Sequence, residues 1–245
     1  MALWAAAENG AEMALVDRAR EGEEAAFTLL MQRHNQWLYR MVRAILRDEG
    51  EAEDVMQEAY VAAYQHLAEF EGRASFRTWL GRIAIHAACK RLRFRRRFES
   101  WQEGGDADCA PAGDAGRSAD PEQEAARTEL RRRLEAAVDR LPARYRTVVM
   151  MRDVEEMSTA DVASFLRLSP ANVKVRLHRA RALLRRELGG HVETLRGRIF
   201  EFPAPRCRRL AARVGAQLRL AAPAAYSAAA VGAARSARAM ASNTA

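Results

Sequence analysis

Cysteine is scarce in this chain of 245 residues: it has three, Cys89, Cys109 and Cys207, which lie far apart and form no CxxC pair. Such spacing indicates neither a disulfide framework nor a standard zinc site, and it favours a reducing compartment. Apolar runs are short as well, and none approaches the ~20 residues that a membrane span requires. The first residues lack the basic start and cleavage site of a secretory signal. We therefore expect a cytoplasmic protein with no membrane insertion, metal or other cofactor.

Leucine, alanine and arginine dominate the composition instead, which favours helices over sheets. Apolar residues recur at helical spacing in two blocks, and the stretch between them mixes Gly, Pro, Asp and Ala without any period. We predict an all-α fold with two small helical domains. An N-terminal helical bundle covers residues 11–98, a flexible acidic linker covers 99–121, and a C-terminal helix-turn-helix domain covers 122–189.

Three further segments lie outside these domains. Residues 1–10 are expected to be a disordered N-terminus, and the Ala/Ser-rich residues 221–245 a disordered tail. Between the second domain and this tail, a C-terminal extension covers residues 190–220. It contains a candidate amphipathic helix with Leu210, Val214 and Leu218 on one side. The extension either contacts a protein or nucleic-acid partner or is a docking helix with no independent function.

The net charge of +8 conceals a segmented distribution. Residues 1–71 carry 14 acidic and 6 basic side chains, whereas 72–98 carry 9 basic and no acidic ones. Residues 99–130 are again acidic, with 9 acidic and 2 basic side chains, and 131–186 are basic, with 14 basic and 6 acidic ones. Two basic blocks divided by an acidic stretch predict two surfaces for a polyanion. The acidic N-terminal block predicts a protein partner.

Residues 158–188 contain two helix starts separated by a short turn. Ser158 with Asp161 forms a capping pair, and Ser169 precedes Pro170, a residue favoured in the first turn of a helix. The second helix has an apolar stripe and basic residues on its other faces. Its stripe consists of Val173, Leu177, Ala180, Leu184 and Leu188. These are the parts of a helix-turn-helix that binds in the DNA major groove, the alternative being a solvated basic helix in an ordinary bundle.

Two helices of the first domain present opposite charges. A helix over about 51–68 buries one apolar face and exposes Asp54 and Glu58, with Gln57 beside them. The next helix starts after Ser75, a plausible cap. It aligns Arg82, His86, Lys90 and Arg93 along one flank.

With these motifs in this order, the chain resembles the extracytoplasmic-function (ECF) sigma factors, the small specificity subunits of bacterial RNA polymerase. The resemblance covers about residues 15–98 and 125–188. Residues 51–60 (EAEDVMQEAY) are similar to the polymerase-binding helix of that family, and 76–84 (FRTWLGRIA) to its promoter-melting segment. Residues 173–181 (VKVRLHRAR) are similar to its C-terminal domain.

The resemblance implies that residues 11–98 are sigma region 2 and 122–189 sigma region 4. It assigns four groups of side chains. The residues that would bind core polymerase are Asp54, Gln57 and Glu58. Those that would contact the minus-10 element are Ser75, Phe76, Trp79, Arg82, His86, Lys90 and Arg93. Those that would contact the minus-35 element are Lys174, Val175, Arg176, His178 and Arg179. Phosphate contacts fall to Arg144, Arg146 and Arg167. Three residues depart from the family pattern: His86 replaces a common asparagine, Val175 a small polar residue, and Glu156 the usual glycine of the turn.

The implied function is non-catalytic: the chain binds core RNA polymerase and directs promoter-specific initiation. Its partners would be the clamp of the largest polymerase subunit, the flap of the second-largest subunit, promoter DNA and, in addition, an anti-sigma factor. Polymerase binding would spread two domains that otherwise hide their DNA surfaces, and the linked pair would gain affinity through effective concentration.

Two other functional classes compete with this interpretation. A stand-alone DNA-binding regulator would use the same helix-turn-helix without polymerase. An enzyme with a cysteine nucleophile would need a histidine close to Cys89 or Cys109, and His86 is the nearest in sequence. Some assigned residues also have structural alternatives: Phe76 and Trp79 are common core anchors, and the carboxylates at 54 and 58 are common on solvated helix faces.

Overall fold

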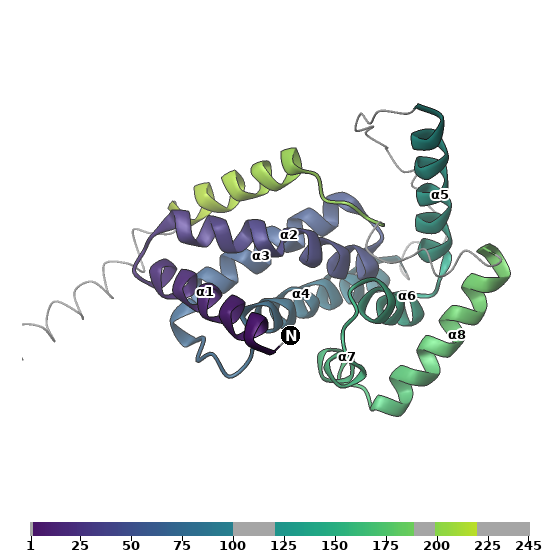
Figure 1. The fold of residues 1–245 in the computed structure, drawn as a ribbon, viewed down its shortest axis with the longest axis horizontal. Coiled ribbons are helices and arrows are strands. Elements are labelled where there is room, and N and C mark those ends of the chain that lie inside the picture. Colours follow the sequence, from purple (N-terminus) through teal and green to yellow (C-terminus); the bar gives the residue numbers. More distant parts are fainter. Residues whose placement is uncertain (1, 100–120, 189–198, 220–245) are drawn as a thin grey trace, which may run out of the picture.

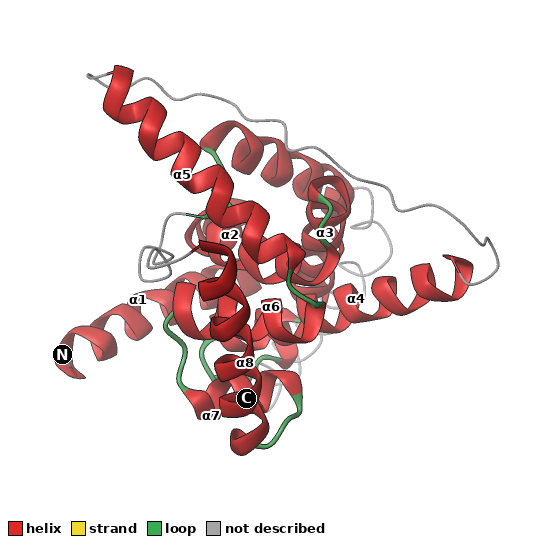
Figure 2. Ribbon diagram, turned by 90° about the vertical axis from the view of Figure 1, so that its right-hand side faces the viewer, coloured by secondary structure: helices red, strands yellow, loops and turns green. Residues whose placement is uncertain are grey.

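The computed structural model describes residues 2–99, 121–188 and 199–219. Helices make up all the regular structure of these ranges, which confirms the all-α prediction (Figure 2). The first domain holds α1 (Ala2–Arg20), α2 (Glu24–Leu46), α3 (Glu49–Gln65), η1 (Leu67–Glu69) and α4 (Phe76–Glu99). The second holds α5 (Pro121–Arg140), α6 (Ala143–Val149), η2 (Met150–Val154), α7 (Thr159–Leu166) and α8 (Pro170–Leu188). Residues 204–219 form a further helix.

The predicted linker lies between the last helix of the first domain and the first helix of the second. Helix α4 ends at Glu99 and α5 begins at Pro121, the two ends of the predicted linker, whose interior (100–120) lies outside the described residues. The tail 221–245 lies outside them as well. The N-terminus differs from expectation, because α1 begins at Ala2, within the segment expected to be disordered.

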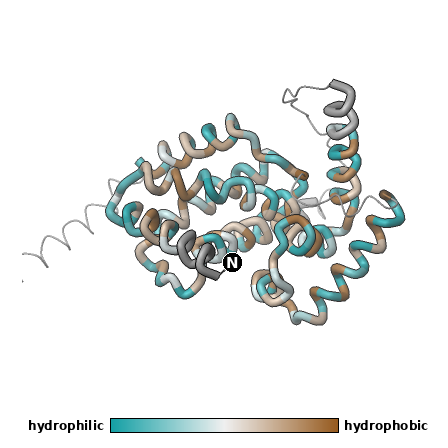
Figure 3. The backbone as a smooth tube through the Cα atoms, viewed as in Figure 1, coloured by the Kyte–Doolittle hydropathy of each residue, from teal (hydrophilic) through white to brown (hydrophobic). Residues whose placement is uncertain are grey.

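Helix α2 is the centre of the molecule. It packs against α1, α3, α4 and α6, and side chains on all its sides are buried, Leu30, Leu38, Tyr39 and Met41 among them. A helix that is apolar on all sides is stable in water only when other elements cover it. Figure 3 shows hydrophobic (brown) and hydrophilic (teal) residues alternating along the helices.

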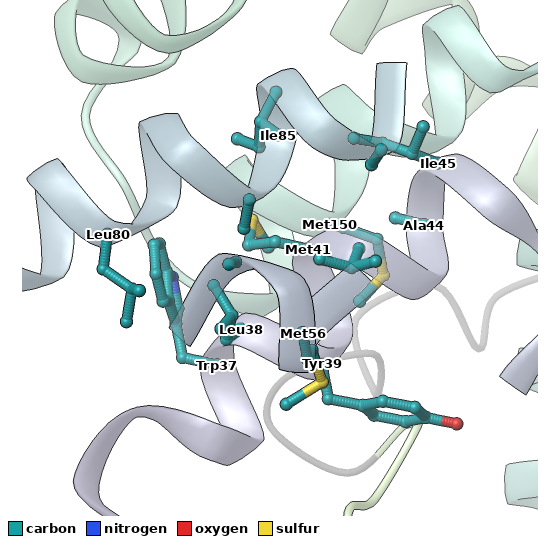
Figure 4. Close-up of a cluster of buried hydrophobic side chains, with 14 of the residues drawn as sticks. Trp37, Leu38, Tyr39, Met41, Ala44, Ile45, Met56, Leu80, Ile85 and Met150 are labelled. Carbon is teal, nitrogen blue, oxygen red and sulfur yellow. The ribbon is translucent and has the colours of Figure 1, made fainter. Parts of the chain in front are cut away.

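The two domains share one continuous core. Figure 4 shows Met150 of η2 among side chains of α2, α3 and α4, including Met41, Met56 and Ile85. Helix α4 approaches α2 and α7 closely at Gly81, where a Cβ would lie 2.4 Å from the Trp37 ring and 2.8 Å from the Phe165 ring. Only glycine fits this crossing, and it brings the start of α4 against the C-terminal domain.

Charged side chains fix the two domains to each other. Arg40 of α2 pairs with Glu155, which also accepts a hydrogen bond from Arg77 of α4. Arg43 forms a two-bond pair with Asp139 of α5, at 3.1 and 2.8 Å. Because both oxygens of each carboxylate are used, these contacts define one relative orientation of the domains.

Candidate protein and nucleic-acid interfaces

The carboxylates predicted on α3 lie together on its exposed stripe. Helix α3 is capped by Asp48, whose side chain accepts a hydrogen bond from the Glu51 amide at 2.7 Å. Two turns of helix then place Asp54 and Glu58 on the surface with about half of each side chain exposed. Gln57 lies beside them and is partly buried. We call Asp54, Gln57 and Glu58 the docking face.

Each residue of the docking face has a partner within the chain. Glu58 accepts a hydrogen bond from Arg91 of α4 at 2.8 Å. Asp54 accepts one from Arg213, and Gln57 donates one to Gln217, each at 2.8 Å. Sequence reasoning did not foresee that the C-terminal extension reaches this face. The available signal was charge, since residues 199–219 contain five arginines and one glutamate and the face is acidic.

The helix-turn-helix forms where it was predicted. Ser158 Oγ accepts from the Asp161 amide at 3.0 Å and caps α7, and Ser169 Oγ accepts from the Asn172 amide at 3.2 Å and caps α8. The predicted stripe is buried from Val173 to Leu184, and Leu188 is partly buried. Local capping and an apolar stripe therefore fix the orientation of α8 about its own axis, as the sequence indicated.

The predicted minus-35 residues lie on the outer side of α8. Lys174, Val175, His178 and Arg179 are exposed, and Val175 keeps 50% of its surface accessible. Arg176 is partly buried and donates a hydrogen bond to Asn172 Oδ1 at 2.9 Å, which fixes its guanidinium along the helix. These groups sit in the N-terminal half of the second helix, the part of a helix-turn-helix that contacts base edges.

The basic side of α4 is exposed as predicted. His86, Lys90 and Arg93 lie on the surface, and Arg82 donates a hydrogen bond to Ser164 of α7 at 3.2 Å. We call these four residues the basic flank. Ser75 lies just before α4 on the surface, and its hydroxyl accepts a hydrogen bond from the Thr78 amide at 3.2 Å. The structure thus brings together four cations or potential cations, one of which is engaged by the other domain.

The two aromatic residues assigned to the minus-10 element are placed differently. Phe76 is fully buried, packed edge-on against Phe70 at 5.9 Å between ring centroids and tilted against His34. Trp79 is partly buried, with its ring centroid 5.2 Å from that of Phe70. Phe76 differs from the expectation of a DNA contact because its ring completes the core; Trp79 keeps part of its surface accessible.

The prediction that Arg146 contacts phosphate is wrong. Its side chain is 1% exposed and donates hydrogen bonds to the carbonyl oxygens of Ala44, Ile45, Asp139 and Leu141. These carbonyls lie at the C-terminal ends of α2 and α5, where helices leave acceptors unpaired. Burial lowers the pKa of Arg146 to about 9, with a further lowering from Arg47 nearby. Arg146 is therefore an internal link between the domains.

The other two arginines assigned to phosphate are exposed. Arg144 lies over the Tyr145 ring at 4.8 Å, and a hydrogen bond from Arg179 lowers the pKa of the same tyrosine. Arg167 follows α7 in the left-handed region, with φ of 52°. Both remain accessible to a polyanion beside α8.

The two cysteines in the described residues, Cys89 and Cys207, are both partly buried. Burial raises the pKa of the Cys89 thiol, although Arg93 opposes the shift. Cys207 Sγ accepts a hydrogen bond from Asn35 at 2.7 Å, and Cys109 lies outside the described residues. Within the described ranges, no three side chains of His, Cys, Asp or Glu gather as a metal site would require. None of the described helices combines the length and apolar character that crossing a membrane demands.

Comparison with known proteins supplies the family. The Sigma-70 region 2 family matches residues 30–98, and the Sigma-70, region 4 family matches 131–184. The RNA polymerase sigma-H factor of Pseudomonas aeruginosa is 32% identical over 71% of this chain and 92% of its own length. The ECF RNA polymerase sigma-E factor of Haemophilus influenzae is 31% identical over 74% and 97%. The solved structure of CnrH in complex with the cytosolic domain of CnrY is 30% identical, with a TM-score of 0.50 over 71% of this chain and 94% of that one.

Proposed function

Because this chain belongs to the ECF sigma factors of bacterial RNA polymerase, we propose that its acidic and basic surfaces divide the work of transcription initiation. As a sigma factor it binds core polymerase and directs initiation at promoters by recognising their minus-10 and minus-35 elements. One observation carries the assignment of residues: the acidic stripe lies on α3, the basic flank on α4 and the capped helix-turn-helix in α7 and α8.

The docking face is our candidate for the contact with core polymerase. Exposed carboxylates on a rigid helix can pair with basic side chains of a partner and set the register of the complex. In this proposal the partner is the clamp of the largest subunit, and the flap of the second-largest subunit receives the C-terminal domain. The exposure of half of Asp54 and of Glu58 supports it, since neither carboxylate is buried in the core of the domain.

The outer side of α8 is our candidate for contact with the minus-35 element. Arg179 can form two hydrogen bonds with guanine, and Lys174 can reach a base edge or a phosphate. Val175 offers only an apolar contact, such as one with a thymine methyl group. Its exposure supports this role, because an apolar side chain left half exposed in the middle of a basic face serves no packing purpose in the described chain.

The basic flank and Trp79 are our candidates for the minus-10 element. Opened DNA strands bind to grooves that combine cations along the phosphates with an aromatic ring on which bases stack. His86, Lys90 and Arg93 supply the first part, Trp79 supplies the second, and Ser75 lies at the end of the loop before them. Phe76 supports Trp79 from the core, with 5.8 Å between their ring centroids.

The two DNA surfaces must separate when a promoter is bound. About 25 base pairs between the two elements span ~85 Å at 3.4 Å per base pair, whereas a single folded body of this length is only ~45 Å across. The chain between Glu99 and Pro121 can extend to at most ~75 Å. We infer that polymerase binding breaks contacts such as Arg82–Ser164 and moves the domains apart.

We further propose that the protein acts in the cytoplasm, where it meets polymerase, and that it catalyses no reaction. A cysteine nucleophile needs a lowered thiol pKa, whereas burial raises the pKa of Cys89. His86, the neighbouring candidate base, is exposed on the basic flank and serves DNA in this proposal.

Transcription in vitro with sigma-free core polymerase on a promoter library tests the function. Initiation from one class of promoters, sharing two motifs, is the expected result. Replacing Asp54, Gln57 and Glu58 together by alanine should abolish initiation while circular dichroism shows an unchanged helical signal. The matched control replaces Glu69 and Glu71, two exposed carboxylates outside α3, and should initiate normally.

Two results would contradict the proposal. Promoter-specific initiation by the triple variant at the wild-type level would remove the docking face from it. Sequence-specific binding to duplex DNA by the isolated protein, with no effect on core polymerase, would favour a stand-alone regulator.

A further inference from the structure

The C-terminal segment, residues 199–219, lies along α2 and α3 on the side of the docking face (Figure 1). Its first residues are firmly attached. The Gln36 amide donates to the Phe200 carbonyl at 2.8 Å and accepts from the Phe202 amide at 2.7 Å. The Phe202 ring packs on Tyr39, with 4.9 Å between centroids. Ile199, Phe200 and Phe202 are all buried.

The helix that follows, residues 204–219, makes charged contacts through several of its arginines and buries two aliphatic side chains. Arg206 pairs with Glu49 at 2.9 Å and with Glu53 at 2.5 Å. One turn apart on the same side, Arg213 pairs with Asp54 and Gln217 bonds Gln57. Leu210 and Val214 are buried beneath these polar contacts. The segment therefore contacts two of the three residues of the docking face, although Asp54 keeps about half of its side chain exposed.

We propose that the C-terminal segment is an intramolecular ligand of the docking face, and that helix 204–219 must leave this face before core polymerase binds there. The inference rests on the proposed role of Asp54 and Gln57 in polymerase binding. Arg213 bonds Asp54 Oδ1, so a basic side chain of polymerase can bind that oxygen only after Arg213 has left it. Gln217 likewise bonds the side-chain amide of Gln57. Helix 204–219 and core polymerase therefore compete for the same atoms of the docking face.

The contacts are of a kind that a partner can replace. Arg213 and Asp54 are each about half exposed, and exposed ion pairs are weak. Gln57 Oε1 is buried beside the helix and lacks a hydrogen-bond partner among the described residues, which is unfavourable for the covered state. The anchor at Phe200 and Phe202 makes no use of the docking face, so helix 204–219 can leave while the anchor stays and keeps its effective concentration high.

If helix 204–219 covers the docking face, the apparent affinity for polymerase equals the intrinsic affinity multiplied by the fraction of molecules in which the face is open. Weakening the contacts of this helix should therefore tighten the binding of polymerase, although the substitutions only remove side chains. The test uses the full chain and two matched double variants. The first is Arg206→Ala with Arg213→Ala, which removes the contacts to Glu49, Glu53 and Asp54. The second is Arg208→Ala with Arg209→Ala, which removes two exposed arginines of the same helix.

The affinity of each variant and of the wild type for sigma-free core polymerase is measured by titrating the fluorescently labelled protein with core polymerase. We expect about five- to tenfold tighter binding for the first variant and wild-type affinity for the second. Hydrogen exchange on the wild-type chain gives an independent measurement that needs no substitution. Amides of 204–219 should exchange faster in the complex with core than in the free protein, whereas those of 49–58 should be at least as protected.

The outcomes separate this inference from the proposed function. The docking face stands if the wild type binds core and the Asp54/Gln57/Glu58 variant does not. In that case the covering role is still overturned if the Arg206/Arg213 variant binds core no tighter than the wild type and the amides of 204–219 stay protected in the complex. If the Asp54/Gln57/Glu58 variant binds core as tightly as the wild type does, the proposed docking face is overturned and the covering role with it.

Discussion

Arg40 of α2 and Glu155 at the end of η2 form a buried ion pair, with 2.9 Å between Nη1 and Oε1. Both side chains are about 10% exposed or less, and Arg40 also donates to the Ile199 carbonyl at 2.9 Å. The same guanidinium thus holds the first domain, the second domain and the C-terminal segment. Since the two domains must separate for the proposed function, this pair is a central contact of the closed state.

Replacing Glu155 by glutamine should loosen the contact between the domains. The charge that compensates Arg40 disappears while the side-chain shape stays, and breaking a buried pair costs about 3 kcal/mol. Small-angle scattering should show a larger radius of gyration, and urea should unfold the variant at lower concentration. Glu71→Gln, at an exposed pair with Arg73, is the control and should change stability by less than about 1 kcal/mol. Equal behaviour of both variants would contradict the central role of the pair.

Glu156 has a φ of 52°, in the left-handed region, at the position where the family resemblance implies glycine. A side chain with a Cβ is strained there by about 1 kcal/mol relative to glycine. Glu156→Gly should therefore be more stable than Glu156→Ala by about that amount in chemical denaturation. The alanine variant is the matched control, because both substitutions remove the carboxylate. An alanine variant as stable as the glycine variant would show that the turn is unstrained.

Burial raises the pKa of Glu135 above its ordinary 4.5, although the Phe200 amide opposes the shift with a hydrogen bond to Oε1 of 2.8 Å. A carboxyl with a raised folded-state pKa stabilises the fold below its unfolded pKa and loses this contribution as pH rises through the folded-state pKa. Glutamine does not ionise and can accept the same bond. Glu135→Gln should therefore be more stable than the wild type at pH 7 and equal to it near pH 3.5. A difference of constant size across this range in thermal melts would refute the assignment.

Lys174→Ala should weaken promoter binding without changing stability. Lys174 is exposed on the outer side of α8, and loss of one phosphate contact reduces the slope of log K against log salt by about 1. The measurement is binding of holoenzyme to promoter DNA at several salt concentrations. Arg186→Ala, exposed in the last turn of the same helix, is the control and should leave the slope unchanged. An equal reduction in both variants would indicate non-specific attraction along the whole helix.

Features that depend on neighbours in sequence were predicted well. The caps at Ser158 and Ser169 and the buried stripe of α8 follow from contacts within four residues, so the pattern of side chains is sufficient to place them. The same holds for the exposed carboxylates of α3 and for His86, Lys90 and Arg93 on α4. A residue far from both ends of an amphipathic helix has its side fixed by periodicity alone.

Features that depend on distant segments were missed. Arg146 carries a charge and lies among other arginines, so the sequence indicated a surface position. The C-terminal ends of α2 and α5 converge on it, however, and supply four carbonyl acceptors. Phe76 falls in a motif that resembles a DNA-binding segment, and its buried ring is the core-anchor alternative that the sequence left open. Periodicity locates the buried side of a helix, yet it does not say which element covers that side.

The sequence by itself determined that this chain is helical, that its charge is segregated, and that it carries a helix-turn-helix, because propensity, capping and helical period act over a few residues. Only the tertiary structure decided that Arg40 joins three segments and that Arg213 covers Asp54. Those contacts join residues about 115 to 159 positions apart, and their free energy comes from burial and pairing that exist only once the whole chain has packed.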